Sequence, residues 1–325
     1  FLLYIIILIM TRKHRGIIQE GFNKGRLLKG YKYTGKKTLT GLPIIKKIKQ
    51  KQIGGNYSNN VLFTCTTFIS KEKKLEELCK ALDTFIKFNS YISDKIIGEY
   101  IIINEYGENT EEKIKILKKK YPKFHFINKK KSNKGQARSV NLIIKYLKKN
   151  KDKFKYWLHW EESWFSTGPI LEKAYNIMVN SNISQLQLIY RWFDVIHAND
   201  ILTIEHEDYV EFKASKRLQK AWNKLPNGSI WKWDKSLKRS IKKGTLWPFY
   251  SLSPGIDRVD QVLNTGYFNE DPNKWPVQFE YEWALKWVKK NKIIKAVIKN
   301  SPIIRSKEHK STYSNNNLKK QNMII

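Results

Sequence analysis

Cysteine is scarce in this chain of 325 residues, which contains only Cys65 and Cys79. Two cysteines cannot form the disulfide framework of a small secreted domain, and they cannot supply the four ligands of a structural zinc site. A reducing compartment is the simpler expectation. The sequence therefore predicts a protein that is cytoplasmic or membrane-associated.

Long apolar runs are also lacking. The apolar run Phe1–Met10 falls short of the roughly 20 residues that span a bilayer. The chain does not start with Met, and basic residues follow this run, so residues 1–15 could be the end of a truncated membrane anchor. A segment packed inside the protein would account for the run equally well. Membrane association through the N-terminus is thus one of two expectations.

Acidic residues are few, with 29 Asp and Glu against 62 Lys and Arg, which gives a formal charge of +33. Such a balance raises nucleic-acid binding as a hypothesis, because basic side chains neutralise phosphates. The lysines, however, occur in nearly every segment, and no zinc-finger, helix-turn-helix or RNA-binding signature is present. We do not expect nucleic acid as the main ligand. The abundance of Lys, Ile and Asn indicates an AT-rich coding genome, such as that of a large virus or an AT-rich microbe.

What the sequence does contain is enough apolar material for a large core, since 41% of residues are hydrophobic and 13% aromatic. We expect one folded domain over residues 61–314. Residues 16–60 are predicted to be an extension or connector that ends in turn-forming residues near Gly54. The polar tail at 315–325 is predicted to be disordered.

Apolar runs alternate with amphipathic segments in the first half of that domain. The predicted strands are Val61–Phe68, Tyr100–Ile103, Phe124–Ile127, Tyr156–Trp160 and Gln185–Tyr190, and the predicted helices are Lys71–Phe88, Glu111–Lys120, Gly135–Lys149 and Gly168–Val179. This alternation predicts an α/β domain with a mainly parallel central sheet flanked by helices. Ligands of such sheets bind beyond the carboxyl ends of the strands. The polar residues there are Thr66, Thr67, Asn104, Glu105, Glu161 and Glu162.

The segment Asn133–Asn141 carries an N-x-G-x-A-x-x-x-N spacing at the start of a predicted helix. Gly135 would let the backbone approach a ligand, and the first turn of the helix offers free N–H groups to an anion. Asn133 could equally be only the N-terminal cap of the helix.

These segments, in this order, resemble glycosyltransferase family two and its GT-A relatives over residues 61–314. The resemblance implies a single catalytic domain with a Rossmann-like GT-A fold, a nucleotide-binding half at 61–165 and an acceptor half at 166–314. The implied activity is transfer of a hexose from a nucleotide sugar, UDP-linked in the first instance, to a glycan, protein or lipid acceptor, by metal-assisted inversion. The residues that it implies for the donor are Thr66, Thr67, Glu105, Asn133, Gly135, Arg138, Asn141 and Glu162.

The acids after Trp160 stand where the family places its metal-binding D-x-D. Glu161 matches the first acid, while Ser163 replaces the second. A divalent cation, Mn²⁺ or Mg²⁺, stabilises the charge of a departing nucleoside diphosphate, which is why carboxylates are expected there. His309 resembles a C-terminal histidine that completes the metal or diphosphate site. The Glu-Glu-Ser variant leaves open whether metal dependence is retained.

Two later segments carry the rest of the resemblance. Trp247–Gly255 is similar to a turn that faces the donor sugar and the acceptor, and Asn264–Glu270 is similar to a common Gly-x-Phe-Asp-Glu turn. Glu280 then matches the first acid of the family's general-base pair, Tyr281 replaces the second, and Glu282 is the reserve. All these acids could instead be solvated residues at strand and helix ends. The alternative from another class is a catalytically degenerate GT-A domain that binds a nucleotide, a sugar or a protein.

Overall fold

The computed structural model describes residues 31–37, 43–47, 57–107, 109–189, 201–226, 247–271, 274 and 276–306. The chain divides into two compact units, Phe1–Asn56 and Tyr57–Ile325. In the first unit, β1 (Tyr31–Lys37) pairs antiparallel with β2 (Pro43–Lys47), within a stretch for which the sequence suggested only a connector. Residues 1–15 and 315–325 lie outside the described ranges.

The second unit contains a nine-stranded sheet in the order β5-β4-β3-β6-β11-β8-β12-β10-β9. Its strands are β3 (Val61–Thr67), β4 (Ile97–Asn104), β5 (Phe124–Asn128), β6 (Tyr156–Glu161), β8 (Gln185–Gln187), β9 (Ile201–Glu205), β10 (Tyr209–Ala214), β11 (Gly255–Arg258) and β12 (Lys295–Ile298). A separate two-stranded sheet joins β7 (Trp164–Ser166) to β13 (Ile303–Arg305).

This architecture confirms the predicted α/β class with helices flanking a central sheet, with one refinement: the sheet is mixed. The strands β5, β4, β3 and β6 are parallel neighbours, as are β8 and β12. In contrast, β11 runs antiparallel to β6 and β8, and β10 runs antiparallel to β12 and β9. Because β11 enters the sheet beside the end of β6, the segment before it lies at the carboxyl edge of the parallel strands.

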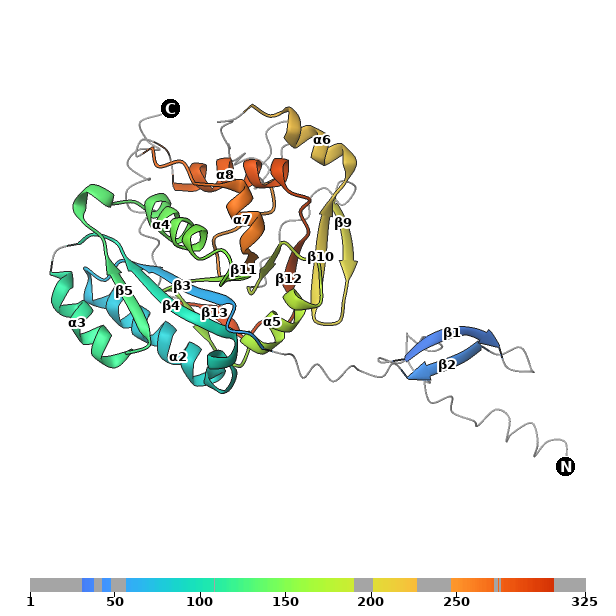
Figure 1. The fold of residues 1–325 in the computed structure, drawn as a ribbon, viewed down its shortest axis with the longest axis horizontal. Helices are drawn as coiled ribbons and strands as arrows, with labels where there is room; N and C mark the ends of the chain where they lie inside the picture. Colours follow the sequence, from blue (N-terminus) through green and yellow to red (C-terminus); the bar gives the residue numbers. More distant parts are fainter. Residues whose placement is uncertain are drawn as a thin grey trace. The chain divides into compact units, whose positions relative to one another are not determined.

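Helices cover both faces of the sheet (Figure 1). One layer holds α2 (Glu72–Ile96) and α5 (Leu171–Val179), with α3 (Thr110–Lys120) beside α2; the other holds α4 (Gln136–Lys149), α7 (Val259–Thr265) and α8 (Pro276–Lys290), with α6 (Lys216–Lys224) against α8. No helix within the described ranges is both long and apolar enough to cross a membrane.

Alternate residues of the central strands pack in two separate hydrophobic cores. Phe63 and Cys65 of β3 pack in the core that contains Leu78 and Phe85 of α2, while Leu62 packs in the core of α4 and α8. Trp283 and Trp287 are fully buried on α8 in that second core. The two cores pack against the two faces of the sheet. The candidate site lies at the edge where the parallel strands have their carboxyl ends.

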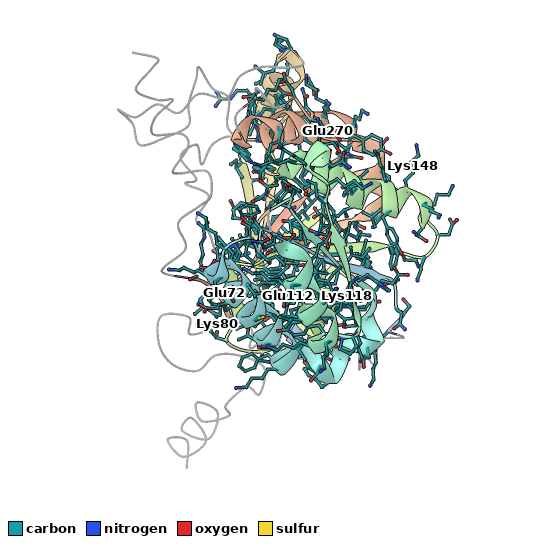
Figure 2. All side chains as sticks on the ribbon, turned by 90° about the vertical axis from the view of Figure 1, so that its left-hand side faces the viewer. Glu72, Lys80, Glu112, Lys118, Lys148 and Glu270 are labelled. Carbon is teal, nitrogen blue, oxygen red and sulfur yellow. The ribbon has the colours of Figure 1, made fainter. Side chains whose placement is uncertain are left out.

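Charged side chains project from several helices rather than from one face. Figure 2 labels Lys80, Lys118 and Lys148, which are exposed residues of α2, α3 and α4. This spread agrees with the dispersed lysines of the sequence.

Candidate functional site at the carboxyl edge of the sheet

The sheet register brings the polar ends of three neighbouring strands together. Thr67 lies opposite Asn104 of β4, and Thr66 lies opposite Glu161 of β6. The backbone N–H of Glu105 donates to the Thr67 carbonyl over 2.8 Å. Parallel strands end at a common edge, so residues that are far apart in sequence become neighbours here.

Glu105 and Gly135 are joined directly. One carboxylate oxygen of Glu105 accepts from the Gly135 backbone N–H at 2.9 Å, and the other accepts from Lys129 Nζ at 2.8 Å and from the Ser139 hydroxyl. Burial lowers the pKa of Lys129, and the Glu105 carboxylate opposes that shift. Glu105 therefore ties the end of β4 to the start of α4.

Gly135 is the N-terminal cap residue of α4 and has a φ of 123°, a conformation that residues with a Cβ rarely adopt. No other atom lies within 4 Å of the position that a Cβ would take. Asn133 is exposed in the short 3-10 helix Lys131–Asn133 and makes no side-chain cap to α4, so its alternative reading as the helix cap is wrong.

Two further residues of α4 hold the turn that follows α7. Asn141 is buried; its amide nitrogen donates to the Phe268 carbonyl at 3.0 Å and to Glu270 Oε1 at 2.7 Å, and its oxygen accepts from the Phe268 N–H at 2.8 Å. Arg138 Nε lies 3.4 Å from Glu270 Oε2, and its guanidinium also donates to the Ser132 carbonyl. Both side chains are engaged with the protein's own turn.

The adjacent acids Glu161 and Glu162 have different partners. Glu162, in the turn after β6, lies 3.3 Å from Lys74 Nζ on α2, and Lys74 also lies 2.9 Å from Glu77. Glu161, the last residue of β6, accepts from the Trp164 indole at 3.0 Å. The two neighbouring carboxylates are therefore held by different side chains.

Glu161 interacts electrostatically with Glu280 of α8. Burial raises the pKa of Glu161 to about 7, the charges of Glu162 and Glu280 add to that shift, and the Trp164 indole and Arg305 oppose it. Glu280 Oε1 accepts from the Leu252 backbone N–H at 2.9 Å. The predicted first metal ligand and the predicted base are therefore electrostatic neighbours.

Ser163 and Glu282 are engaged elsewhere. Ser163 is buried, and its carbonyl accepts from the Ser306 N–H at 2.8 Å. Glu282 accepts from Lys274 Nζ at 2.6 Å, from Gln278 at 3.0 Å and from Asn269 at 3.0 Å. Burial acts to raise the pKa of Glu282, but these three donors outweigh it and the pKa falls.

Among the described residues, no three His, Cys, Asp or Glu side chains converge as a set that could hold a metal ion. His309 lies outside the described ranges. Glu161 and Glu280 offer two carboxylates, and Mg²⁺ is often held by one or two carboxylates together with substrate phosphates.

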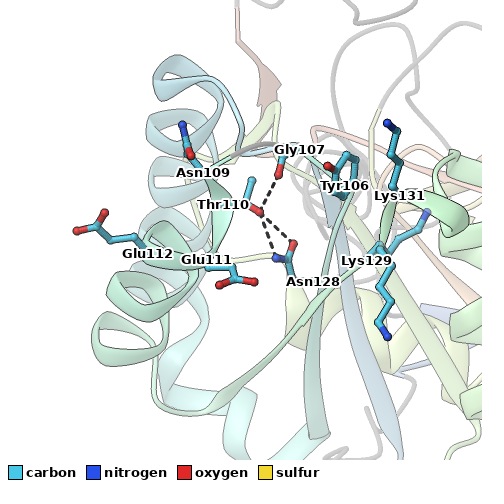
Figure 3. Close-up of a pocket in the computed structure, with 10 residues that line it drawn as sticks. Tyr106, Gly107, Asn109, Thr110, Glu111, Glu112, Asn128, Lys129 and Lys131 are labelled. Carbon is cyan, nitrogen blue, oxygen red and sulfur yellow. Dashed lines mark hydrogen bonds between the residues drawn. The ribbon is translucent and has the colours of Figure 1, made fainter.

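A pocket of about 690 Å³ opens beside this edge, at the ends of β4 and β5 (Figure 3). Thr110 lines it and donates to the Gly107 carbonyl at 3.1 Å, while Asn128 donates to the Thr110 hydroxyl at 3.1 Å. Tyr106 and Lys130 also line the pocket. It has the size of a small-molecule site and an aromatic ring with polar neighbours.

Several buried polar atoms in this part of the sheet have no hydrogen-bond partner among the described residues: Thr67 Oγ1, His159 Nε2, Gln187 Oε1 and the Tyr250 hydroxyl. Thr67 was predicted as a donor residue, whereas sequence reasoning missed the other three. His159 and Gln187 lie on either side of Gly255 in the sheet register. The available signal was the alternation of glutamine with leucine in Gln185–Leu188, which marks polar residues on one face of a buried strand.

No protein-family model and no curated protein matches the chain. Among solved structures, the chain is similar to S. aureus TarS 1–349 in complex with UDP-GlcNAc, with a TM-score of 0.47 and 12% identity over 78% of this chain and 60% of that one. It is also similar to the structure of TarS 1–349 alone, with a TM-score of 0.45, 12% identity and coverage of 74% and 58%. A 4-diphosphocytidyl-2C-methyl-D-erythritol synthase from Anaerococcus prevotii gives a TM-score of 0.39 at 12% identity, with coverage of 76% and 90%. The chain thus spans about three fifths of the TarS fragment, and its function has to be argued from the site itself.

Proposed function

We propose that the Tyr57–Ile325 unit transfers a glycosyl group from a nucleotide sugar, a UDP-sugar in the first instance, to a hydroxyl of a glycan or glycoconjugate acceptor. The observation that carries this proposal is that Glu161, at the carboxyl end of β6, lies within electrostatic range of Glu280 on α8. The start of α4 supports it, because the N–H groups after Gly135, whose own N–H is bound to Glu105, suit an anionic ligand.

The donor would lie along this edge. The pocket at the ends of β4 and β5 would take the nucleoside, and Tyr106 offers it an aromatic ring. The buried Thr67 hydroxyl, which has no partner among the described residues, would hydrogen-bond to the donor. In this arrangement Glu105 holds Gly135 in place, and Arg138 and Asn141 hold the neighbouring turn.

Glu161 would hold Mn²⁺ or Mg²⁺ together with the donor diphosphate. The bound cation would supply stabilisation for the negative charge of the leaving diphosphate. Glu162, which is paired with Lys74, would act on Glu161 only through its charge.

Glu280 is the proposed general base. The acceptor oxygen forms a bond to the anomeric carbon, the bond from that carbon to the phosphate oxygen breaks, and the acceptor proton passes to the Glu280 carboxylate. Attack from the face opposite the leaving group inverts the anomeric centre. Glu280 is favoured over Glu282, because three donors already bind the Glu282 carboxylate.

The test is turnover of a panel of nucleotide sugars by wild type and by Glu280→Gln. We expect the variant to lose about 10²- to 10⁴-fold in kcat, the usual contribution of a positioned base. Glu99→Gln is the matched control: Glu99 lies near the start of β4 and bonds to Tyr146 and Lys153, so its substitution should leave kcat unchanged. Equal kcat in wild type and Glu280→Gln would contradict the assignment.

A catalytically degenerate binding domain is the second candidate. It is favoured by the engagement of the Glu282 carboxylate within the protein and by the lack of a three-residue ligand set among the described residues. Nucleotide-sugar binding by wild type without turnover, at any divalent cation concentration, would support this candidate over the transferase.

A further inference from the structure

A fully buried lysine lies behind Glu280, on a strand that the proposed mechanism does not use. Lys295 of β12 is 0% exposed, and its ammonium donates to Gln185 Oε1 of β8. Gln185 Nε2 in turn donates to Asp257 Oδ1 of β11 at 2.8 Å. The register places these three residues opposite one another on neighbouring strands, so they form one polar row across a buried face of the sheet.

The row reaches Glu280 through the backbone of the segment before β11. Gln185 donates to the Ser251 carbonyl at 2.9 Å and accepts from the Ser251 N–H at 3.2 Å. The next N–H along the chain, that of Leu252, donates to Glu280 Oε1 at 2.9 Å. Gln185 therefore fixes the peptide that orients the Glu280 carboxylate.

Lys295 and Glu280 also interact through their charges. Burial lowers the pKa of Lys295, and the negative charges of Asp257 and Glu280 oppose that shift. Burial raises the pKa of Asp257, and Lys295 opposes it. Lys295 thus interacts electrostatically with two carboxylates, and one of them, Glu280, is the proposed base.

Fold stability alone does not account for this arrangement. Removing a Lys–Asp pair from water is costly, and apolar side chains of similar volume often stabilise a protein equally well or better. The same burial makes the field of Lys295 strong at Glu280, because few water molecules screen it.

We propose that Lys295, Gln185 and Asp257 form a positioning network for Glu280. Gln185 holds the 251–252 backbone that orients the carboxylate, Lys295 supplies a cation that favours its charged form, and Asp257 balances Lys295. The catalytic consequence rests on the proposed transferase function, whereas the coupling between Lys295 and Glu280 does not.

The first test is a double-mutant cycle that needs no substrate. Lys295→Met is combined with Asp257→Asn, so that no uncompensated charge remains buried, and Glu280→Gln is introduced into this background and into wild type. The shift of the urea unfolding midpoint caused by Glu280→Gln is measured in both. We expect a smaller drop in the Lys295→Met/Asp257→Asn background, because the cation that stabilises Glu280 is gone.

Lys299→Met provides the control cycle, since Lys299 directly follows β12 but its ammonium pairs with Glu205 at 3.0 Å. We expect the effect of Glu280→Gln to be the same with and without Lys299. Equal midpoint shifts in the wild-type and Lys295→Met/Asp257→Asn backgrounds would overturn the inference, whatever the activity of the protein.

The second test is kinetic. The Lys295→Met/Asp257→Asn variant should lose at least about tenfold in kcat while the KM for the donor stays within about twofold, as expected when a group that acts in the transition state is misplaced. Wild-type kcat in this folded variant would contradict the positioning role. A wild-type protein without any turnover would instead remove the proposed function and leave the coupling measurement to decide the inference.

Discussion

At the scale of single residues, the site depends on the different partners of two adjacent acids. Glu161 lies within electrostatic range of Glu280, whereas Glu162 pairs with Lys74, so we assign them different tasks. Strand alternation suggested that the two side chains would separate, but a strand end often breaks the rule. β6 ends at Glu161, so the partner of Glu162 could not be predicted from the strand pattern.

His159 lies two residues before Glu161 and gives a prediction in pH. Its Nδ1 is 3.0 Å from the Thr64 hydroxyl, and burial lowers its pKa from 6.5 to about 3. Below about pH 6.5 His159 therefore becomes protonated in the unfolded chain but stays neutral in the folded protein. The folded state loses stability as pH falls from 6.5 towards 3.

We expect His159→Asn to reduce this loss, because its amide oxygen can accept from Thr64 and carries no titrating proton. Urea unfolding at pH 7.5 and pH 5.5 measures the difference. The same substitution at exposed His125 of β5 is the control and should leave the pH dependence as in wild type. Parallel pH dependence in wild type and His159→Asn would refute the burial argument.

At the scale of elements, the strands and helices in the first half of the domain could be predicted from the sequence, whereas the strands between residues 201 and 258 could not. The predicted strand Val61–Phe68 and helix Gly135–Lys149 match β3 and α4 within a residue, because their apolar periodicity is strong. The predicted helix Lys71–Phe88 is shorter than α2, which continues to Ile96. The region from 201 to 258 contains β9, β10 and β11. These strands are short and include charged residues, and the sequence shows no clear hydrophobic periodicity from which to predict them.

The clamp between α4 and the turn after α7 belongs to this scale as well. The family resemblance implied Asn141 as a donor ligand, but its side chain makes three hydrogen bonds to Phe268 and Glu270. The spacing of residues along a helix predicts which side chains point into the protein. It does not predict whether such a side chain contacts a ligand or a distant turn of the same chain.

Asn141→Ala should therefore act on the turn. The substitution leaves the Phe268 N–H and carbonyl without their partner, and we expect a loss of about 2 to 4 kcal/mol of unfolding free energy. Hydrogen exchange at the Phe268 amide should accelerate. Asn150→Ala, at the other end of α4 where the side chain bonds only to the Tyr146 carbonyl, should cost less. Unchanged exchange at Phe268 would argue against the clamp.

At the scale of the whole molecule, the mixed sheet explains how distant segments meet. The parallel strands bring Thr67, Glu105 and Glu161 to one edge, and the antiparallel entry of β11 sets the 247–254 segment beside them. From there Leu252 reaches Glu280 on α8. The sequence predicted the parallel part from strand–helix alternation. The antiparallel part depends on long-range pairing of short strands, which local patterns do not encode.

The most direct test of the account is calorimetric titration of a panel of nucleotide sugars into the protein with Mn²⁺ present. We expect saturable binding of at least one UDP-sugar at a single site, and a loss of at least about tenfold in affinity in Glu161→Gln, equivalent to about 1.4 kcal/mol. A folded wild-type protein that binds no member of the panel would contradict the claim that this edge of the sheet is a nucleotide-sugar site.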